Sequence, residues 1–157
     1  NAKLASGIAD LPALKKAGIN LAIGTDGPAS NNALDMFREM YLAAVLPKLK
    51  YKDAAVMDAA DVLKMATTGG ALAMGLPECM YVKKGQFADL ILIDLQRPNM
   101  QPVHNLVKNL VYSGSKENVK MTMVNGMVLY ENGEFFVGES PSEIYAKANE
   151  VTKRITQ

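Results

Sequence analysis

The chain of 157 residues is 49% hydrophobic and 21% charged, a composition typical of an ordinary packed domain. Its formal net charge is only +1, and its Lys and Arg residues are scattered along the chain. A dedicated nucleic-acid-binding protein would gather basic side chains on one face, so we expect no nucleic-acid partner. No apolar run is long enough to span a bilayer, and the single cysteine, Cys79, excludes an internal disulfide framework. We therefore expect no membrane partner and a reducing, cytoplasmic setting.

The chain opens with a loop, which is followed by a short helix and a strand. Residues 11–17 are predicted to form the helix, with Asp10 as its N-cap and Gly18 as its stop. The alternating apolar residues of 19–23 predict a buried strand that runs directly into Gly24-Thr25-Asp26-Gly27. This order of helix, strand and loop is typical of a parallel barrel or a doubly wound sheet.

Two further helices are predicted before residue 76. Asn31 or Asn32 is expected to cap the first, and Pro47 is expected to end it, which leaves 48–52 as a solvated basic connector. The apolar stripe of this helix, at helical spacing, consists of Leu34, Phe37, Tyr41 and Val45. The second helix begins at Asp58 and is interrupted by a Thr-Thr-Gly-Gly run.

Short strands replace the helices after Pro77. Residues 80–82 and 90–93 are predicted strands, the second of them buried, and 106–112 are predicted to form a short helix. The dipeptide Asn125-Gly126 lies between two apolar runs and predicts a β-hairpin.

The chain ends in a predicted helix. Ser140 is its expected N-cap, Pro141 occupies the first helical position, and Glu143 completes a capping box. The chain thus divides into an alternating helix and strand region, a strand-rich region and a terminal helix. These regions are 1–76, 77–138 and 139–157.

Asp26 is the strongest candidate in the sequence for a catalytic or metal-ligating residue. It stands where an apolar strand ends, between two glycines that let the backbone turn, and in barrel enzymes the C-terminal ends of strands carry the chemistry. From position alone, a metal-ligating or general-base role and a loop-capping role weigh about equally. Ser30 and Asn31 follow in the same loop, where they could line a substrate mouth or serve only as loop and cap residues. Asn1 and Lys3 are further candidates for the pocket.

The chain lacks the residues for an ordinary zinc site of its own. His104 is its single His and Cys79 its single Cys, whereas such a site takes three or four ligands mainly from these two residue types. His104 lies in a predicted loop, so we expect a structural or surface role for it. Nothing near Cys79 in the sequence lowers the pKa of its thiol, so we expect it to be inert. We therefore interpret the chain as part of a larger catalytic barrel.

Four segments, in order along the chain, resemble the C-terminal part of the amidohydrolase superfamily. They are Asn1-Ala-Lys-Leu-Ala-Ser-Gly7, Gly24-Thr-Asp-Gly-Pro-Ala-Ser-Asn-Asn32 with Leu34-Asp-Met36, Leu63-Lys-Met-Ala-Thr-Thr-Gly-Gly-Ala71 followed by Gly75-Leu76, and Lys84-Gly-Gln-Phe-Ala-Asp-Leu90 with Asp94. Gly-Thr-Asp-Gly alone would be a weak match, but the ordered set is specific. Within the superfamily, the segments are most similar to the methylthioadenosine/S-adenosylhomocysteine deaminase group, which is chlorohydrolase-like.

The resemblance implies an α/β fold in which 1–76 supply the last units of a metal-dependent (β/α)8 barrel. Residues 77–138 would supply part of a small β-sandwich, and the terminal helix would pack outside. The full-length enzyme is expected to bind one divalent metal, zinc, with Asp26 as metal ligand and proton shuttle. The metal would activate a water that attacks the amino-bearing carbon of an adenosine-type substrate and releases ammonia. Asp26, Ser30 and Asn31 would then contact this nucleoside.

The family's His ligands, which come from other barrel strands, are absent from this chain. We therefore expect the fragment alone to bind no metal and to be inactive. Exposed strand edges and apolar helix faces would favour a homo-oligomer or association with a missing half. Two alternatives stay open. One is a sibling amidohydrolase, such as a chlorohydrolase acting on a cyclic amidine or triazine, and the other is a non-catalytic scaffold or interaction module.

Overall fold

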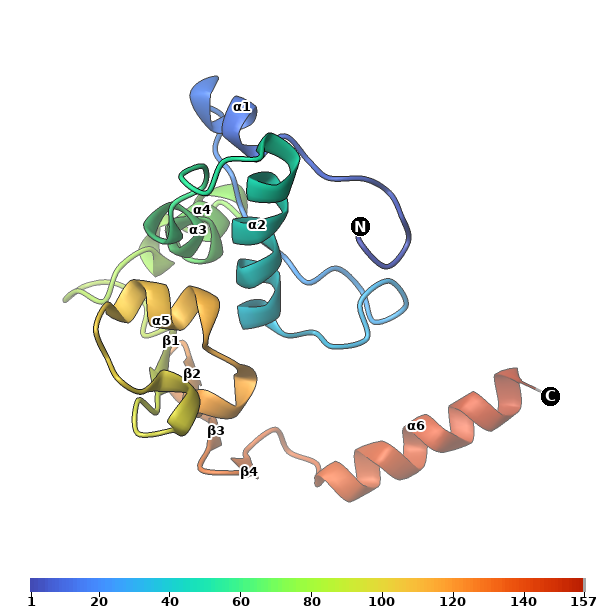
Figure 1. Cartoon of the computed structure of the whole chain (residues 1–157). Coiled ribbons are helices and arrows are strands. Elements are labelled where there is room, and N and C mark those ends of the chain that lie inside the picture. Colours follow the sequence, from blue (N-terminus) through green and yellow to red (C-terminus); the bar gives the residue numbers. More distant parts are fainter. Residues whose placement is uncertain (157) are drawn as a thin grey trace.

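The computed structural model describes residues 1–156, in which most of the helices gather together and one small antiparallel sheet lies below them in Figure 1. The α-helices are Leu11–Lys16 (α1), Met36–Tyr51 (α2), Ala59–Ala66 (α3), Thr68–Ala73 (α4), Leu106–Tyr112 (α5) and Pro141–Ile155 (α6). The strands are Leu90–Ile93 (β1), Val119–Val124 (β2), Met127–Glu131 (β3) and Glu134–Phe135 (β4). Short 3₁₀ helices lie at Pro77–Cys79, Pro98–Met100 and Lys116–Asn118. Within residues 1–156, no helix combines the length and the apolarity needed to cross a membrane.

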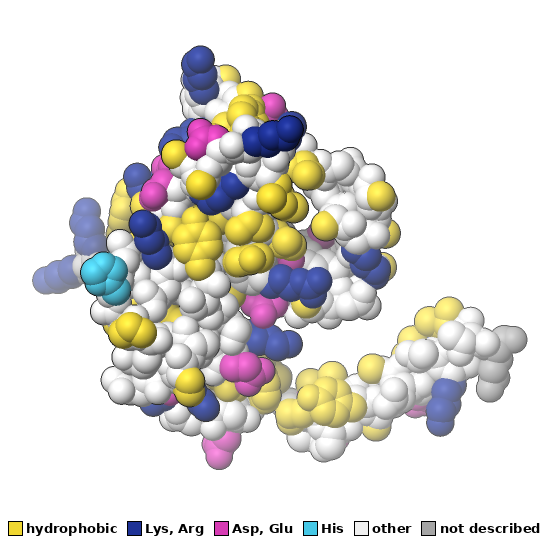
Figure 2. All heavy atoms as spheres, in the orientation of Figure 1, with side chains coloured by type: hydrophobic (Ala, Val, Ile, Leu, Met, Phe, Trp, Pro, Cys, Tyr) yellow, Lys and Arg dark blue, Asp and Glu magenta, His cyan; other side chains and the backbone are white. Residues whose placement is uncertain are grey.

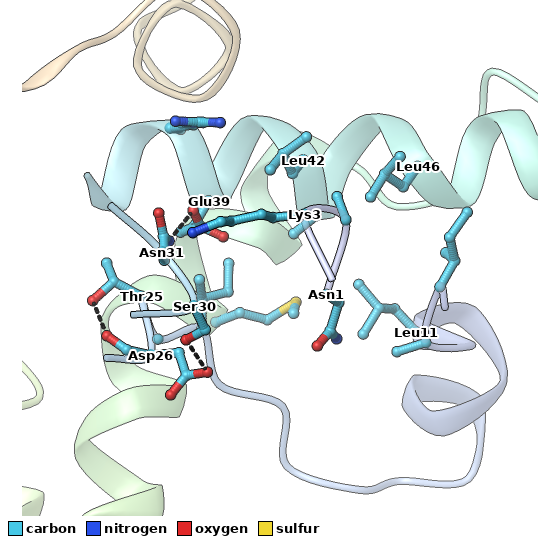
Figure 3. A pocket seen from close by; sticks show the side chains of 18 of the residues that line it. Asn1, Lys3, Leu11, Thr25, Asp26, Ser30, Asn31, Glu39, Leu42 and Leu46 are labelled. Carbon is cyan, nitrogen blue, oxygen red and sulfur yellow. Dashed lines mark hydrogen bonds between the residues drawn. The ribbon is translucent and has the colours of Figure 1, made fainter. Parts of the chain in front are cut away.

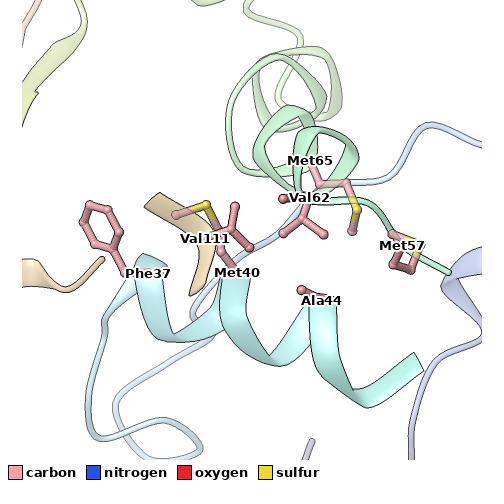
Figure 4. Close-up of a cluster of buried hydrophobic side chains, with 8 residues drawn as sticks. Phe37, Met40, Ala44, Met57, Val62, Met65 and Val111 are labelled. Atoms are coloured by element: carbon pink, nitrogen blue, oxygen red, sulfur yellow. The ribbon is translucent and has the colours of Figure 1, made fainter. Parts of the chain in front are cut away.

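The hydrophobic core lies where α2, α3 and α5 meet (Figure 4). Its buried members are Phe37, Met40 and Ala44 of α2, Met57, Ala59, Val62 and Met65 of α3 and the residues before it, and Val111 of α5. Leu21 and Ile23 pack against this cluster from the N-terminal segment. The core therefore holds the segment that leads to Asp26 against two helices.

Asp35, rather than Asn31 or Asn32, caps α2. Its carboxylate accepts hydrogen bonds from two backbone N–H groups of the first turn, at 3.0 and 3.4 Å. The prediction of an Asn cap is wrong because both Asn side chains are engaged elsewhere, one with Glu39 and the other with Lys3.

α2 continues through Pro47 and ends only after Tyr51, so the predicted helix end and the basic connector are both wrong. A proline inside a helix costs about 3 kcal/mol because it lacks the N–H and crowds the preceding turn. Pro47 is fully buried on the core-facing side of α2, and this packing offsets the cost. Lys48 is not solvated connector: its Nζ donates to three backbone oxygens of the following loop, those of Ala54 (2.9 Å), Val56 (2.6 Å) and Met57 (3.2 Å).

The apolar stripe of α2 differs from the predicted one. Phe37 is buried and Val45 is partly buried, but Leu34 and Tyr41 are exposed. Leu34 precedes the helix, because the cap falls at Asp35. The buried face instead follows Phe37 with Met40, Ala44 and Pro47.

Residues 19–23 do not form the predicted strand. A strand needs a hydrogen-bonded neighbour, and within residues 1–156 no other strand lies beside this segment. The segment is held by helices instead, because the N–H of Ile23 donates to the carbonyl of Met65 at 3.1 Å and the amide of Asn20 donates to that of Gly69 at 3.0 Å.

The four strands pair antiparallel in chain order, and the predicted hairpin is confirmed. Asn125 and Gly126 both have positive φ, 48° and 78°, as the two-residue turn between β2 and β3 requires. Residues 80–82 form bends, not the predicted strand, since the sheet of the described residues ends at β1. β1 is also not buried: Ile91 and Leu92 are about half exposed because no layer covers them in this part of the protein.

The terminal helix α6 has the predicted capping box. The hydroxyl of Ser140 accepts from the N–H of Glu143 at 3.3 Å, and the Glu143 carboxylate accepts from the N–H of Ser140 at 2.9 Å. None of the side chains of residues 141–155 is buried, and α6 projects away from the rest of the molecule (Figure 1). The predicted cap of α6 is therefore confirmed, whereas its apolar side chains are left uncovered.

Candidate functional site

A cavity of about 420 Å³ lies between the N-terminal loop, residues 22–26 and α2 (Figure 3). One end of it is polar and includes Asp26 and Ser30, and the other is apolar and includes Leu42 and Leu46 of α2. The segment before Asp26 reaches the cavity because the core holds Ile23 in place. A polar end beside an apolar wall suits a small organic molecule with a reactive polar group.

Asp26 lies in a left-handed backbone conformation, with φ of +58°. Asp and Asn adopt this conformation more readily than other non-glycine residues. Its Oδ1 accepts from the N–H of Gly27 at 2.7 Å, and its Oδ2 accepts from the hydroxyl of Ser30 at 2.6 Å. The bond from Ser30 first, and then the bond from Gly27, lower the pKa of the Asp26 carboxyl. The side chain is therefore an exposed carboxylate at neutral pH, able to bind a cation or accept a proton.

The structure brings all three predicted site residues to the same cavity. Ser30 contacts Asp26 directly, whereas Asn31 faces α2: its Nδ2 donates to Oε1 of Glu39 at 2.7 Å (Figure 3). The Oδ1 of Asn31 accepts from the N–H of Ala33 at 3.3 Å. Asn31 is thus engaged by the protein at both ends of its amide, and its contact with a substrate stays a prediction.

Asn1 and Lys3 also line the cavity. Lys3 Nζ donates to Oδ1 of Asn32 at 2.6 Å and to the carbonyl of Ala29 at 3.0 Å. The N-terminal loop is therefore joined to the loop that follows Asp26.

The donor set of the described residues does not make a complete metal centre. Within residues 1–156, no three His, Cys, Asp or Glu side chains gather closely enough to hold a metal ion. Zinc needs three or four such ligands. Among the predicted site residues, Asp26 is the one that carries a carboxylate, so together they offer a metal a single carboxylate ligand.

The single His and the single Cys lie outside this cavity. His104 is exposed in the loop before α5. The Cys79 thiol donates to Oδ2 of Asp89 at 2.9 Å, and this bond raises the pKa of the thiol to about 11. The thiolate is scarce at neutral pH, as expected for an inert Cys.

Sequence reasoning missed Glu39 as a residue of the site. Glu39 lies four residues after the helix cap, on the first turns of α2, and lines the cavity beside Asn31. In the sequence, Glu39 is the one carboxylate on the helix that follows the Asn31-Asn32 pair. This pattern does not predict a contact, because only the fold brings Glu39 to Asn31.

The similarity of this chain to known proteins covers most of its length. The profile of the Amidohydrolase family matches residues 1–129. The 5-methylthioadenosine/S-adenosylhomocysteine deaminase of Haloquadratum walsbyi is 50% identical over 134 residues, which are 85% of this chain and 30% of that protein.

Solved structures show the same similarity. An adenosine deaminase from Xanthomonas campestris with bound zinc matches with a TM-score of 0.93 and 39% identity, over 99% of this chain and 36% of that one. An atrazine chlorohydrolase from Arthrobacter aurescens complexed with zinc matches with a TM-score of 0.76 and 29% identity, over 92% of this chain and 32% of that one. The chain spans about a third of the length of these relatives. With the family profile matched over most of its residues, the chain belongs to the amidohydrolase family.

Proposed function

We propose that this chain is the C-terminal part of a metal-dependent deaminase that acts on adenosine-type nucleosides, with 5-methylthioadenosine and S-adenosylhomocysteine as substrates. The similarity to proteins of those names supports the substrate class. The observation that carries the proposal is the ionised carboxylate of Asp26, held by Ser30 at the polar end of a cavity.

The activity belongs to the intact protein in this proposal. Residues 1–76 supply the last units of a (β/α)8 barrel, 77–138 part of a β-sandwich, and 139–157 a helix outside it. Asp26 is one ligand of a divalent metal, zinc, and the other ligands come from outside these 157 residues. When bound, such a metal supplies Lewis acidity and makes an attacking water more acidic.

The chain's own residues hold and move a proton. The Asp26 carboxylate takes a proton from the attacking water and returns it to the leaving amine, which departs as ammonia. The Ser30 hydroxyl keeps the carboxylate oriented through its bond at 2.6 Å. Ser30 and Asn31 line the mouth through which the nucleoside enters. The exposed apolar faces of this chain support association, either with the rest of the intact protein or with a second copy in a homo-oligomer.

A sibling hydrolase is the second candidate. The structural similarity to an atrazine chlorohydrolase supports a site that displaces chloride from a triazine. It has less support than deamination, because the identity is 29% against 50% for the deaminase relative. No observation at the site favours a non-catalytic scaffold, since the Asp26 carboxylate and its cavity are both formed.

The test begins with the natural gene product. Its intact mass is measured, and the purified protein is loaded with zinc and offered 5-methylthioadenosine, S-adenosylhomocysteine and atrazine. We expect a mass well above that of 157 residues and ammonia release from the nucleosides, but no chloride release. Release of chloride without release of ammonia would support the chlorohydrolase function instead. A mass matching this chain, with no turnover, would overturn both.

A further inference from the structure

The loop that carries the predicted site residues is held from outside at two points. We call residues 26–34 the Asp26 loop. Inside it, the N–H groups of Ser30 and Asn31 both donate to the carbonyl of Gly27, at 3.1 and 2.9 Å. From outside, Lys3 bonds to the middle of the loop and Glu39 bonds to the Asn31 amide at 2.7 Å.

Glu39 is the anchor on a rigid element. It lies on α2 between Phe37 and Met40, which are both buried in the core, so the helix cannot shift at this turn without disturbing the packing. Lys3, by contrast, is exposed in the N-terminal loop. The bond to Glu39 therefore ties the Asp26 loop to the core.

Asn31 follows Ser30 directly, so a restraint on Asn31 also restrains the backbone of Ser30. The Ser30 hydroxyl lies 2.6 Å from the Asp26 carboxylate, a contact that a small movement of the loop would break. Misplacement of a reacting group by about 1 Å can lower a rate by about 100-fold.

We propose that Glu39 is a positioning residue: through the Asn31 amide it fixes the Asp26 loop on α2 and thereby keeps Ser30 on the carboxylate of Asp26. Its effect on catalysis rests on the proposed function, whereas its effect on the loop does not. The competing role is stabilisation of α2, since an acidic residue near a helix N-terminus interacts favourably with the helix dipole.

Two variants of the intact protein separate these roles. Glu39→Gln keeps an acceptor oxygen for the Asn31 amide but loses the charge, and Glu39→Leu loses both. Asp58→Ala is the matched control, because it removes the α3 cap, bonded to the N–H of Ala60 at 2.8 Å, and so lowers stability away from the loop.

Hydrogen exchange and steady-state kinetics are then measured on each variant. For Glu39→Leu we expect exchange at the N–H groups of Ser30 and Asn31 to rise by about tenfold, the factor for a lost charge-assisted hydrogen bond. We expect kcat to fall by roughly 10- to 100-fold with little change in KM. Glu39→Gln should stay close to wild type in both measurements, and Asp58→Ala should change only the melting temperature.

Three results would overturn the proposal. The first is hydrogen exchange in the Asp26 loop of Glu39→Leu that equals the wild-type rate. The second is a Glu39→Gln variant whose loop exchange and kcat are changed as much as those of Glu39→Leu. The third is a rise in loop exchange in Asp58→Ala as large as that in Glu39→Leu. If the wild-type protein deaminates nothing, the proposed function fails, but the exchange measurement still decides whether Glu39 holds the loop.

Discussion

The carboxylate of Asp26 combines an unusual backbone conformation with two short hydrogen bonds. Its positive φ places the side chain over the turn that follows, where Gly27 and Ser30 both donate to it. Asp26 and Ser30 are four residues apart in one turn, so their contact is local, although the sequence assigns Ser30 only to the substrate mouth or the loop. The contact between Asn31 and Glu39 crosses from a loop to a helix, and no local rule predicts it.

Replacing Asp26 tests its catalytic role. Asn tolerates a positive φ, so Asp26→Asn in the intact, zinc-loaded protein should fold normally. We expect kcat/KM for 5-methylthioadenosine to fall by about 10³-fold, because the proposed function makes Asp26 both a metal ligand and a proton acceptor, and Asn would replace neither role. Asp94→Asn is the control, since Asp94 also has a lowered pKa but lies at the end of β1. Equal kcat/KM in Asp26→Asn and wild type would refute the role.

The hydrogen bond of the Cys79 thiol leads us to expect that the folded protein loses stability at alkaline pH. Its hydrogen bond to Asp89 raises the pKa of the thiol from 9.0 to about 11 in the folded protein. Between these two pH values the folded state binds more protons than the unfolded state, so the free energy of unfolding falls as pH rises. The stabilisation is complete below pH 9 and is lost as pH passes 11.

Cys79→Ser isolates this effect from the titration of Lys and Tyr. A serine hydroxyl donates to Asp89 without ionising in this range. Denaturant unfolding of both proteins from pH 8 to 11.5 should show a steeper loss for wild type. Parallel curves would show that the bond does not form in solution.

At the scale of the elements, Gly69 decides how closely α4 approaches the segment before Asp26. A Cβ atom built on Gly69 would lie 2.2 Å from the carbonyl oxygen of Leu21, whereas one on Gly70 would meet nothing closer than 3.9 Å. The first glycine is required by packing and the second is not.

Substitution of the two neighbouring glycines by Ala should have opposite effects. Gly69→Ala forces the backbone apart, and we expect it to lower the free energy of unfolding by about 1–3 kcal/mol. Gly70→Ala adds helix propensity without a clash, so we expect no loss and a gain of up to about 1 kcal/mol. Urea unfolding of the pair measures both, and equal effects would contradict the close approach.

The elements that the sequence predicts well are those with local causes. The hairpin follows from Asn125-Gly126 and the start of α6 from Ser140 and Glu143, because their hydrogen bonds join residues close in sequence. Pro47 is the opposite case. Its local preference ends a helix, but burial against the core keeps α2 intact, and burial depends on residues far along the chain.

At the scale of the whole molecule, large apolar side chains remain exposed on several elements. Figure 2 shows them over α2 and along α6. Examples outside the core are Leu49 of α2, Met74 after α4, Met127 of β3 and Ile155 of α6. β1 also lies at an edge of the described sheet. Such faces favour association.

We therefore expect the isolated 157-residue chain to self-associate. Size-exclusion chromatography with light scattering should give a mass above the monomer that rises with concentration, together with binding of a hydrophobic dye. The intact protein serves as the control, in which dye binding should be weaker. A dilution-independent monomer without dye binding would contradict the expectation.

The family, the short helix α1, the hairpin and the capping box are all predictable from the sequence, because each depends on residues that are close together or on an ordered set of motifs. Only the packing of the folded chain places 19–23 against helices rather than in a sheet and brings Glu39 to Asn31. These features depend on which distant segments pack or pair with one another. Local secondary-structure propensities do not encode such contacts.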